Sequence, residues 1–309
     1  MISICIPVYN VNVEQLVNDL SRQGDRLRIP YEIVVIDDFS SGETRKVNKR
    51  VCENHKYILL EKNRGRAGIR NLFPEYSQYG KLLFVDCDST IISEDYLKNY
   101  LDTIRELKPD VICGGSLYRD QPPGRNKRLR WKYGREKESR VHYIRQKYPY
   151  TYFTGNNFII DRKIFDRVRF DDRITEYGYE DTLFAWELYK NGVKICHIEN
   201  PLLNDHTDDN IVYLKKTEQA VSNLVKILYY IEFDKTFIRK VTILDFYYKL
   251  SAVRMSAIFR IFFLILRPVI RYMLVKGFAS LPLFDIYKLG MLSVNFRKDR
   301  GVHEPWSNI

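Results

Sequence analysis

Residues 1–36 read MISICIPVYNVNVEQLVNDLSRQGDRLRIPYEIVVI, and this stretch decides the fold. Residues 2–8 and 32–36 are short apolar runs rich in β-branched side chains, which is typical of buried strands. Between them, Leu16, Val17 and Leu20 recur at helical spacing in an otherwise polar segment. The stretch therefore predicts a strand, a helix and a second strand.

The same alternation continues along the chain. Further strands are predicted at 57–60, 82–85, 110–113, 157–160 and 194–198, and helices at 68–79 and at 181–190, which ends at Asn191-Gly192. Strands that alternate with helices form a mostly parallel sheet with helices on both faces. The predicted fold class is α/β, and such sheets bind ligands at the carboxyl ends of their strands.

The composition is that of a large globular chain with a basic end. The 309 residues are 45% hydrophobic and 29% charged, which excludes a disordered chain or a disulfide-stapled miniprotein. Most of the net charge of +11 lies in residues 211–309, which hold 16 Lys and Arg against 7 Asp and Glu. Strand patterns stop at the same place. We expect an α/β domain over 1–210 and a helical, basic, amphipathic region over 211–309.

Three features bear on cellular location. The five cysteines form no C-x-x-C pair and mostly lie in apolar runs, as expected of reduced thiols. No basic segment precedes the first apolar run, so no signal peptide is expected. Basic residues interrupt the most hydrophobic segment, 254–276, so a transmembrane helix is not expected. A cytoplasmic protein is predicted.

Two acidic pairs directly follow predicted strands. Asp86 and Asp88 flank one residue after the strand at 82–85, where two carboxylates can reach one hard cation such as Mg²⁺ or Mn²⁺. A solvated turn is the alternative. Asp37 and Asp38 form the second pair, and one of them can accept a hydrogen bond from a base or ribose; a turn or helix cap is the alternative.

A third acidic pair, Glu180 and Asp181, opens the helix predicted at 181–190. The positive end of the helix dipole favours carboxylates there and holds them ionised. Such an aspartate can serve as a base, and an ordinary helix N-terminus is the alternative.

Several motifs together resemble the family 2 glycosyltransferases of the GT-A fold in both order and spacing. They are PVYN at 7–10, VVIDDFS at 34–40, NRGRAGIRN at 63–71, DCD at 86–88, TGNN at 154–157 and GYEDTLF at 178–184. The resemblance covers roughly residues 1–210. It implies a Rossmann-like GT-A catalytic domain followed by the helical C-terminal region.

The resemblance implies a site for a nucleotide-sugar donor. Pro7 and Tyr9 would line the nucleobase pocket, and Asp37 or Asp38 would read the base, with uracil expected. Arg70 would face the diphosphate.

It also implies a metal site and a catalytic base. Asp86 and Asp88 would hold the ribose and a Mn²⁺ or Mg²⁺ ion. His206 would complete the metal shell, and a surface or capping histidine is the alternative. Asp181 would be the catalytic base, and Glu180 beside it would orient the acceptor.

A basic segment at about 120–150 lies on the acceptor side in the resembling family. Residues 124–147 carry ten Lys or Arg against Glu136 and Glu138. These residues are expected either to meet an anionic acceptor or to form a solvated helix face. Nucleic acid is not the expected partner, because no binding module is recognisable.

The most apolar segment, 257–276, places Arg260, Arg267 and Arg271 close to one helical face, and Pro268 is expected to kink or divide the helix. Such a helix suits an anionic membrane surface. Packing onto the catalytic domain or a homodimer partner is the alternative.

These observations predict an inverting glycosyltransferase that moves a sugar from a UDP-sugar to a hydroxyl of a glycan or lipid-linked oligosaccharide in polysaccharide biosynthesis. It would act at the inner face of the membrane. Transfer to polyprenyl phosphate and a catalytically inactive nucleotide-binding protein are the alternatives.

Overall fold

The computed structural model describes residues 1–205 and 207–298. These residues form two units. The sheet unit comprises residues 1–119, 135–175 and 180–205, and the helical unit comprises 120–134, 176–179 and 207–298.

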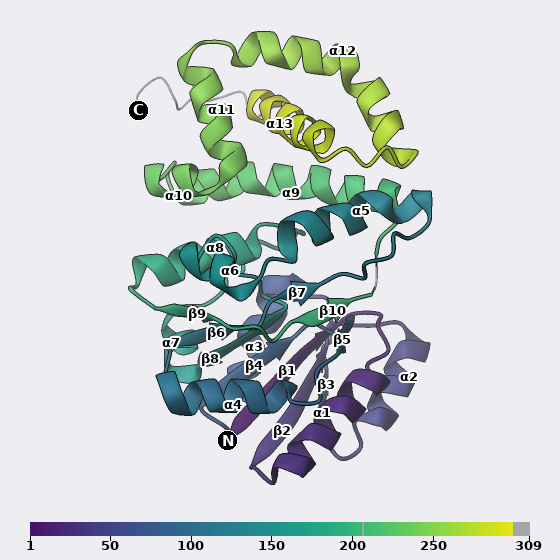
Figure 1. Cartoon of the computed structure of the whole chain (residues 1–309), viewed down its shortest axis with the longest axis vertical. Helices are drawn as coiled ribbons and strands as arrows, with labels where there is room; N and C mark the ends of the chain where they lie inside the picture. Colours follow the sequence, from purple (N-terminus) through teal and green to yellow (C-terminus); the bar gives the residue numbers. More distant parts are fainter. Residues whose placement is uncertain (206, 299–309) are drawn as a thin grey trace. The chain divides into compact units, whose positions relative to one another are not determined.

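A seven-stranded sheet lies at the centre of the sheet unit (Figure 1). Its order is β3 (Lys56–Leu59), β2 (Tyr31–Asp37), β1 (Ile2–Val8), β4 (Lys81–Val85), β8 (Asn157–Asp161), β6 (Val111–Cys113) and β9 (Ile195–His197). Every pairing is parallel except those that β8 makes with β4 and β6. The prediction of an α/β fold with a mostly parallel sheet is confirmed.

The antiparallel β8 was predicted as a strand, but its direction was not. β4 and β6 run the same way, with a helix crossing between them, and leave one strand position open. β8 fills that position from the opposite direction, so it begins at the edge where its parallel neighbours end. This brings residues 154–157 to the carboxyl edge of the sheet.

Helices cover both faces of the sheet. On one face, α1 (Glu14–Leu27) and α4 (Tyr96–Leu107) pack on side chains such as Ile4 and Ile6. On the other, α3 (Gly65–Tyr76), α7 (Arg162–Arg167) and α8 (Glu180–Lys190) pack on side chains such as Cys5. β1 is therefore apolar at successive positions because it is buried on both sides.

The remaining elements of the sheet unit are short. A second, three-stranded sheet, which was not predicted, consists of β5 (Ser89–Ile91), β10 (Leu202–Asn204) and β7 (Ser116–Leu117). Two helices, α2 (Gly42–Val51) and α6 (His142–Lys147), complete the unit.

The end of α8 follows the predicted signal. Gly192 takes the left-handed conformation with φ 67°, and Val193 N–H donates to the Leu188 carbonyl at 3.0 Å. This is the backbone pattern that glycine permits just after a helix.

The helical unit contains α5 (Arg128–Tyr133), α9 (Asn210–Tyr230), α10 (Lys235–Lys240), α11 (Thr242–Ala252), α12 (Ser256–Val275) and α13 (Leu281–Lys298). Figure 1 shows α13 between α9 and α12, and it packs against both. No helix of the described residues is long and apolar enough to cross a membrane.

Of the two effects expected of Pro268, a kink or a division of the helix, the division is wrong, whereas Figure 1 shows α12 bent along its length. α12 runs without interruption from Ser256 to Val275 with Pro268 inside it. Phe263 lies before the proline, and Ile270 and Leu274 lie after it, and all three are buried in the unit. Because packing anchors both halves, the helix tolerates the one hydrogen bond that proline cannot make.

Candidate active site

The carboxyl edge of the sheet gathers most of the predicted site residues. Asp38 N–H donates to the Val8 carbonyl at 2.7 Å, which joins the ends of β2 and β1. Asp86 N–H donates to the Asn156 carbonyl at 3.0 Å, which joins the end of β4 to the start of β8. Segments far apart in the sequence therefore meet at one edge.

A buried guanidinium holds the Asp86 carboxylate. Arg70, on α3, is 2% exposed, and its Nη2 donates to Asp86 Oδ1 at 2.7 Å and to the Gly155 carbonyl at 3.3 Å. The Arg70 guanidinium carbon also lies 5.5 Å from the centre of the Phe170 ring. A charge-assisted bond between two shielded groups fixes their geometry. Arg70 thus orients Asp86, and its contact with a diphosphate stays a prediction.

Asp181 lies in the first turn of α8, and its Oδ2 accepts a hydrogen bond from Gly155 N–H at 2.9 Å. Its Oδ1 is buried, with no hydrogen-bond partner among the residues that the structure describes. Burial, and secondarily the charge of Glu180, raise the pKa of Asp181 to about 6, although Arg70 lowers it. A carboxylate with this pKa is mostly ionised at neutral pH and still basic enough to take a proton.

Gly155 leaves the space that Asp181 occupies. A Cβ at position 155 would stand 2.4 Å from Asp181 Oδ1, closer than side chains approach. Glycine is therefore required for this close approach. Through its carbonyl and N–H, Gly155 also links Arg70 to Asp181.

Glu180 is 4% exposed, and its Oε1 lies 3.5 Å from Nη1 of the half-exposed Arg66. Arg66 was not among the site residues predicted from the sequence. The indication in the sequence was its position four residues before Arg70, because residues four apart lie on the same side of a helix, here α3. That Glu180 orients an acceptor stays a prediction.

The Asp37 and Asp38 carboxylates are buried, and both are hydrogen-bonded. Asp37 accepts from Ser40 N–H at 2.7 Å and from the Tyr57 hydroxyl at 2.5 Å. Asp38 accepts from the N–H groups of Arg64 and Gly65 at 2.6 and 3.0 Å, at the start of α3. Burial raises the pKa of Asp38, and these N–H groups lower it less. Base reading by either residue stays a prediction.

Pro7 and Tyr9 differ in exposure. Pro7, in β1, is half-buried, whereas the Tyr9 side chain just past the strand is 53% exposed. Tyr9 is thus available to a ligand at this edge. Contact of either residue with a nucleobase stays a prediction.

The residues at the end of β4 fit a hard divalent cation. Asp86 is partly shielded and Asp88 is exposed, so the pair offers carboxylate oxygens to a cation that keeps water or phosphate oxygens as its other ligands. No group of three or more His, Cys, Asp or Glu that could hold a metal ion occurs in residues 1–205 and 207–298. His206, the predicted third ligand, lies outside the described residues.

One residue of the basic segment is part of the interior. Arg145 is 3% exposed, and its guanidinium donates to the Gly114 and Ile198 carbonyls at 3.0 and 2.6 Å and to His197 Nδ1 at 2.8 Å. Burial, and then the Arg145 charge, lower the pKa of His197 to about 4, so the imidazole is neutral and can accept. Arg145 is therefore a buried residue that bonds to the protein interior, and neither of the two expectations for the basic segment, a solvated helix face or contact with an acceptor, fits it.

Residues 3–169, more than half of the chain, match the family described as glycosyl transferase family 2. The chain belongs to that family. Similar curated proteins include chondroitin synthase of Escherichia coli, 23% identical over 65% of this chain and 34% of that protein. Dolichyl-phosphate beta-glucosyltransferase of Mus musculus is 30% identical over 38% of this chain and 41% of that protein. The chain thus spans well under half the length of these relatives.

Solved structures of glycosyltransferases resemble this fold at low identity. Mannosyltransferase PcManGT from Pyrobaculum calidifontis, in complex with GDP-Man and Mn²⁺, is 14% identical with a TM-score of 0.52, covering 99% of this chain and 77% of that one. TarS 1–349 of S. aureus, in complex with UDP-GlcNAc, is 17% identical with a TM-score of 0.51, covering 96% and 91%. These likenesses support the GT-A fold. The family match ends before Glu180 and Asp181, so those two rest on the geometry above.

Proposed function

We propose that the chain is an inverting glycosyltransferase that moves a sugar from a nucleotide-sugar, with UDP as the expected nucleotide, to a hydroxyl of a glycan or lipid-linked oligosaccharide. The observation that carries this proposal is the linked set of Arg70, Asp86, Gly155 and Asp181. It combines an oriented carboxylate for the donor side with a carboxylate of raised pKa for the acceptor side.

Asp181 removes the proton of the acceptor hydroxyl as the hydroxyl oxygen attacks the anomeric carbon. The bond from that carbon to the diphosphate oxygen breaks, and the nucleoside diphosphate leaves from the opposite side, so the anomeric centre inverts. Arg70 holds Asp86, and Glu180 with Arg66 flanks the base. Asp86 and Asp88, with His206 as a further candidate, would hold Mn²⁺ or Mg²⁺, which would neutralise charge on the diphosphate when bound.

Turnover of a panel of UDP- and GDP-sugars with Mn²⁺ tests this proposal, with release of nucleoside diphosphate as the measurement. Asp88→Ala should lose turnover and weaken UDP binding in Mn²⁺ without loss of the fold, because an exposed strand-end carboxylate contributes little to the core. Asp172→Ala, another exposed aspartate of the sheet unit, is the matched control. Unchanged Mn²⁺-dependent UDP affinity in Asp88→Ala would contradict the metal assignment.

The runner-up function is transfer to a polyprenyl phosphate, which the similarity to a dolichyl-phosphate glucosyltransferase favours. A phosphate oxygen is already ionised and needs no base. Asp181→Asn would then retain near-normal turnover, whereas the hydroxyl acceptor requires Asp181. An inactive nucleotide-binding protein would bind UDP but release none from any UDP-sugar.

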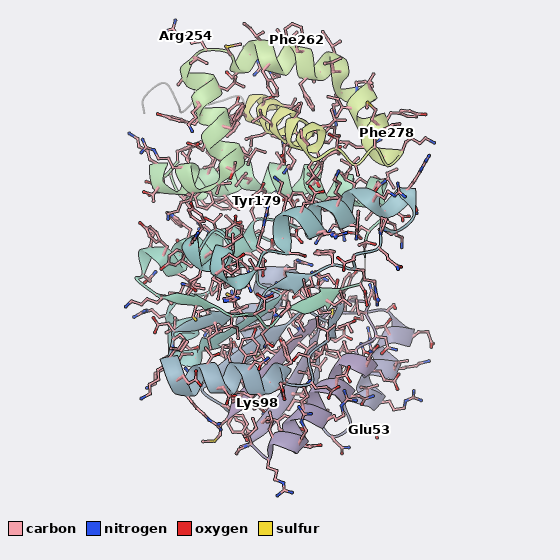
Figure 2. All side chains as sticks on the ribbon, in the orientation of Figure 1. Glu53, Lys98, Tyr179, Arg254, Phe262 and Phe278 are labelled. Atoms are coloured by element: carbon pink, nitrogen blue, oxygen red, sulfur yellow. The ribbon has the colours of Figure 1, made fainter. Side chains whose placement is uncertain are left out.

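We place this chemistry at an anionic membrane surface, with α12 as the docking element. Figure 2 labels Phe262 on the outer side of α12. Its neighbours on that side are also apolar, and each is at least half exposed: Ile258, Ile261, Ile265, Leu266, Val269 and Tyr272. An exposed apolar patch of this extent is uncommon unless something covers it.

The charge around α12 favours anionic lipid over a second copy of the chain. Residues 246–284 contain six Lys and Arg and no Asp or Glu, so two such faces would repel each other. The predicted lipid contacts need one correction. Arg267 and Arg271 lie 3.9 Å from Glu218 on α9, whereas Arg254 and Lys276 are exposed at the ends of α12.

Co-sedimentation with vesicles of neutral lipid, with and without an anionic lipid, tests the membrane assignment. Binding should require anionic lipid and weaken in salt without vanishing, because the apolar face remains. Replacing Ile261, Phe262 and Ile265 by Ser should remove the salt-resistant part. Leu107→Ser, at an exposed leucine of the sheet unit, should change nothing. Failure to bind, together with a concentration-dependent dimer, would assign the face to a homodimer.

A further inference from the structure

Two exposed aromatic side chains follow neighbouring strands at the carboxyl edge. Val8 of β1 pairs with Asp37 of β2, so the segments that follow the two strands begin at the same edge of the sheet. Tyr9 is 53% exposed and Phe39 is 50% exposed. The family resemblance assigned Tyr9 to the nucleotide, but nothing has assigned a role to Phe39.

The two loops are joined to each other. Asn10 N–H donates to Ser40 Oγ at 2.8 Å, and Ser41 N–H donates to Asn10 Oδ1 at 2.7 Å. Arg45 from α2 adds a further contact, since its Nη2 donates to the Ser40 carbonyl at 3.0 Å. The positions of the residues on both loops are therefore fixed by the protein itself.

The conformation of Phe39 is not explained by folding. Its φ is 70°, in the left-handed region, where a bulky side chain is strained and glycine is not. Phe39 is 50% exposed, so burial of its side chain offsets little of the strain energy. The Arg45 guanidinium carbon lies 5.7 Å from the ring centre and packs over one face of it. Strain of this kind concentrates at ligand sites.

The neighbouring Asp37 carboxylate is engaged inside the protein. Asp37 is fully buried, and its two oxygens already accept from Ser40 N–H and the Tyr57 hydroxyl. Its bonds fix the turn that displays Phe39.

We propose that Phe39, held by Arg45, forms with Tyr9 an aromatic platform on which the base of the nucleotide donor stacks. This inference rests on the proposed function and adds Phe39 as a nucleoside-binding residue. Stacking depends on the flat face of a base rather than on its hydrogen-bonding groups. The platform therefore contributes to affinity for any nucleotide, and choice of base is left to other contacts.

Phe39→Gly separates binding from stability. Glycine accepts φ 70° without strain, so thermal stability should be kept or raised. Affinity for UDP in Mn²⁺, measured by titration calorimetry, should fall about tenfold, the order of one base stacked on one ring. Affinity for pyrophosphate in Mn²⁺, which has no base, should not change. Phe39→Trp should retain UDP affinity.

Phe233→Gly is the matched control, because Phe233 in the helical unit also has a left-handed backbone, with φ 55°. It should leave UDP affinity unchanged. If Phe39→Gly binds UDP as tightly as the wild type, the platform is refuted while the proposed function stands. An equal loss for UDP and pyrophosphate would also refute it, because it would indicate a disturbed loop. If the wild type binds neither UDP nor GDP, both proposals fail.

Discussion

Replacing Asp181 by Asn should increase the stability of the protein relative to wild type as the pH rises from 4 to 8, and should remove most of its turnover. Burial raises the pKa of Asp181 from 3.8 to about 6, and one pKa unit corresponds to about 1.4 kcal/mol. Keeping this carboxylate ionised in the folded state therefore costs up to about 3 kcal/mol at pH 8.

The sign follows from the direction of the shift. Because the folded-state pKa lies above the unfolded-state value, the folded protein binds the proton more tightly. The stabilising contribution is complete below about pH 4 and is lost as the pH rises through about 6. Asn does not titrate. The free energy of unfolding of Asp181→Asn relative to wild type should thus rise by up to about 3 kcal/mol between pH 4 and pH 8.

Urea unfolding of both proteins at pH 4, 6 and 8 measures this difference. Any cost of placing the Asn amide beside Gly155 is the same at each pH, so it cancels in the comparison. Asp171→Asn provides the control, because the Arg173 contact lowers the pKa of Asp171 below its usual 3.8. The contribution of Asp171 to stability is lost only below about pH 4, so the difference between Asp171→Asn and wild type should hardly vary across these three pH values. A difference between Asp181→Asn and wild type that does not vary with pH would refute the assignment of a desolvated carboxylate.

The same variant tests the chemistry. Turnover should fall by about 10²- to 10⁴-fold, the range for loss of a general base, while Mn²⁺-dependent UDP affinity is kept. In the wild type, kcat should rise as the pH increases through about 6, where Asp181 ionises.

Three further outcomes are expected. Gly155→Ala should lower turnover at least about 100-fold by displacing Asp181, as seen in steady-state rates, whereas Gly80→Ala, at a position with open space, should not. Arg70→Lys should weaken Mn²⁺-dependent UDP binding about tenfold, because a single ammonium does not reproduce the contacts of Nη2 with Asp86 and the Gly155 carbonyl together with that of Nη1 with the Arg66 carbonyl; calorimetry measures this. The pKa of His197 is about 4 in the folded state, below its unfolded value of 6.5, so the free energy of unfolding should fall as the pH drops from 6.5 to 4. In urea unfolding experiments, His197→Gln should reduce this dependence on pH.

The parts of the fold that sequence predicted are those with strong periodicity. The run ISICIPV is buried on both faces of the sheet, and Gly192 ends α8 by a local conformational rule. The direction of β8 was not predictable in this way, because NFIID has the same apolar pattern in either direction. The short strands β5, β7 and β10 have two or three residues each, too few for any pattern.

The candidate site, too, could be predicted only in part from the sequence. Motif positions located Asp86 and Asp181, but their partners lie far away in the sequence, and no spacing rule joins Arg70 to Gly155. Pro268 does not divide α12, because buried neighbours on both sides of it hold the two halves in one helix. Phe39 could not be singled out from the sequence, because the feature that distinguishes it is its positive backbone φ, which only the structure gives.

The place of β8 determines the order in which the protein can fold. Lys81 of β4 pairs with Asp161 and Val111 of β6 pairs with Ile160, so this central strand closes two long loops at once. A nascent chain that ends before residue 157 has β4 and β6 with unpaired backbone groups along one side, and closing such loops is the slow part of folding. Insertion of β8 also delivers Asn156 and Gly155 to Asp86 and Arg70. Formation of β8 therefore both closes the gap in the sheet and brings together part of the candidate site, so a chain that lacks β8 also lacks the contacts of Asp86 and Arg70 with residues 155–156.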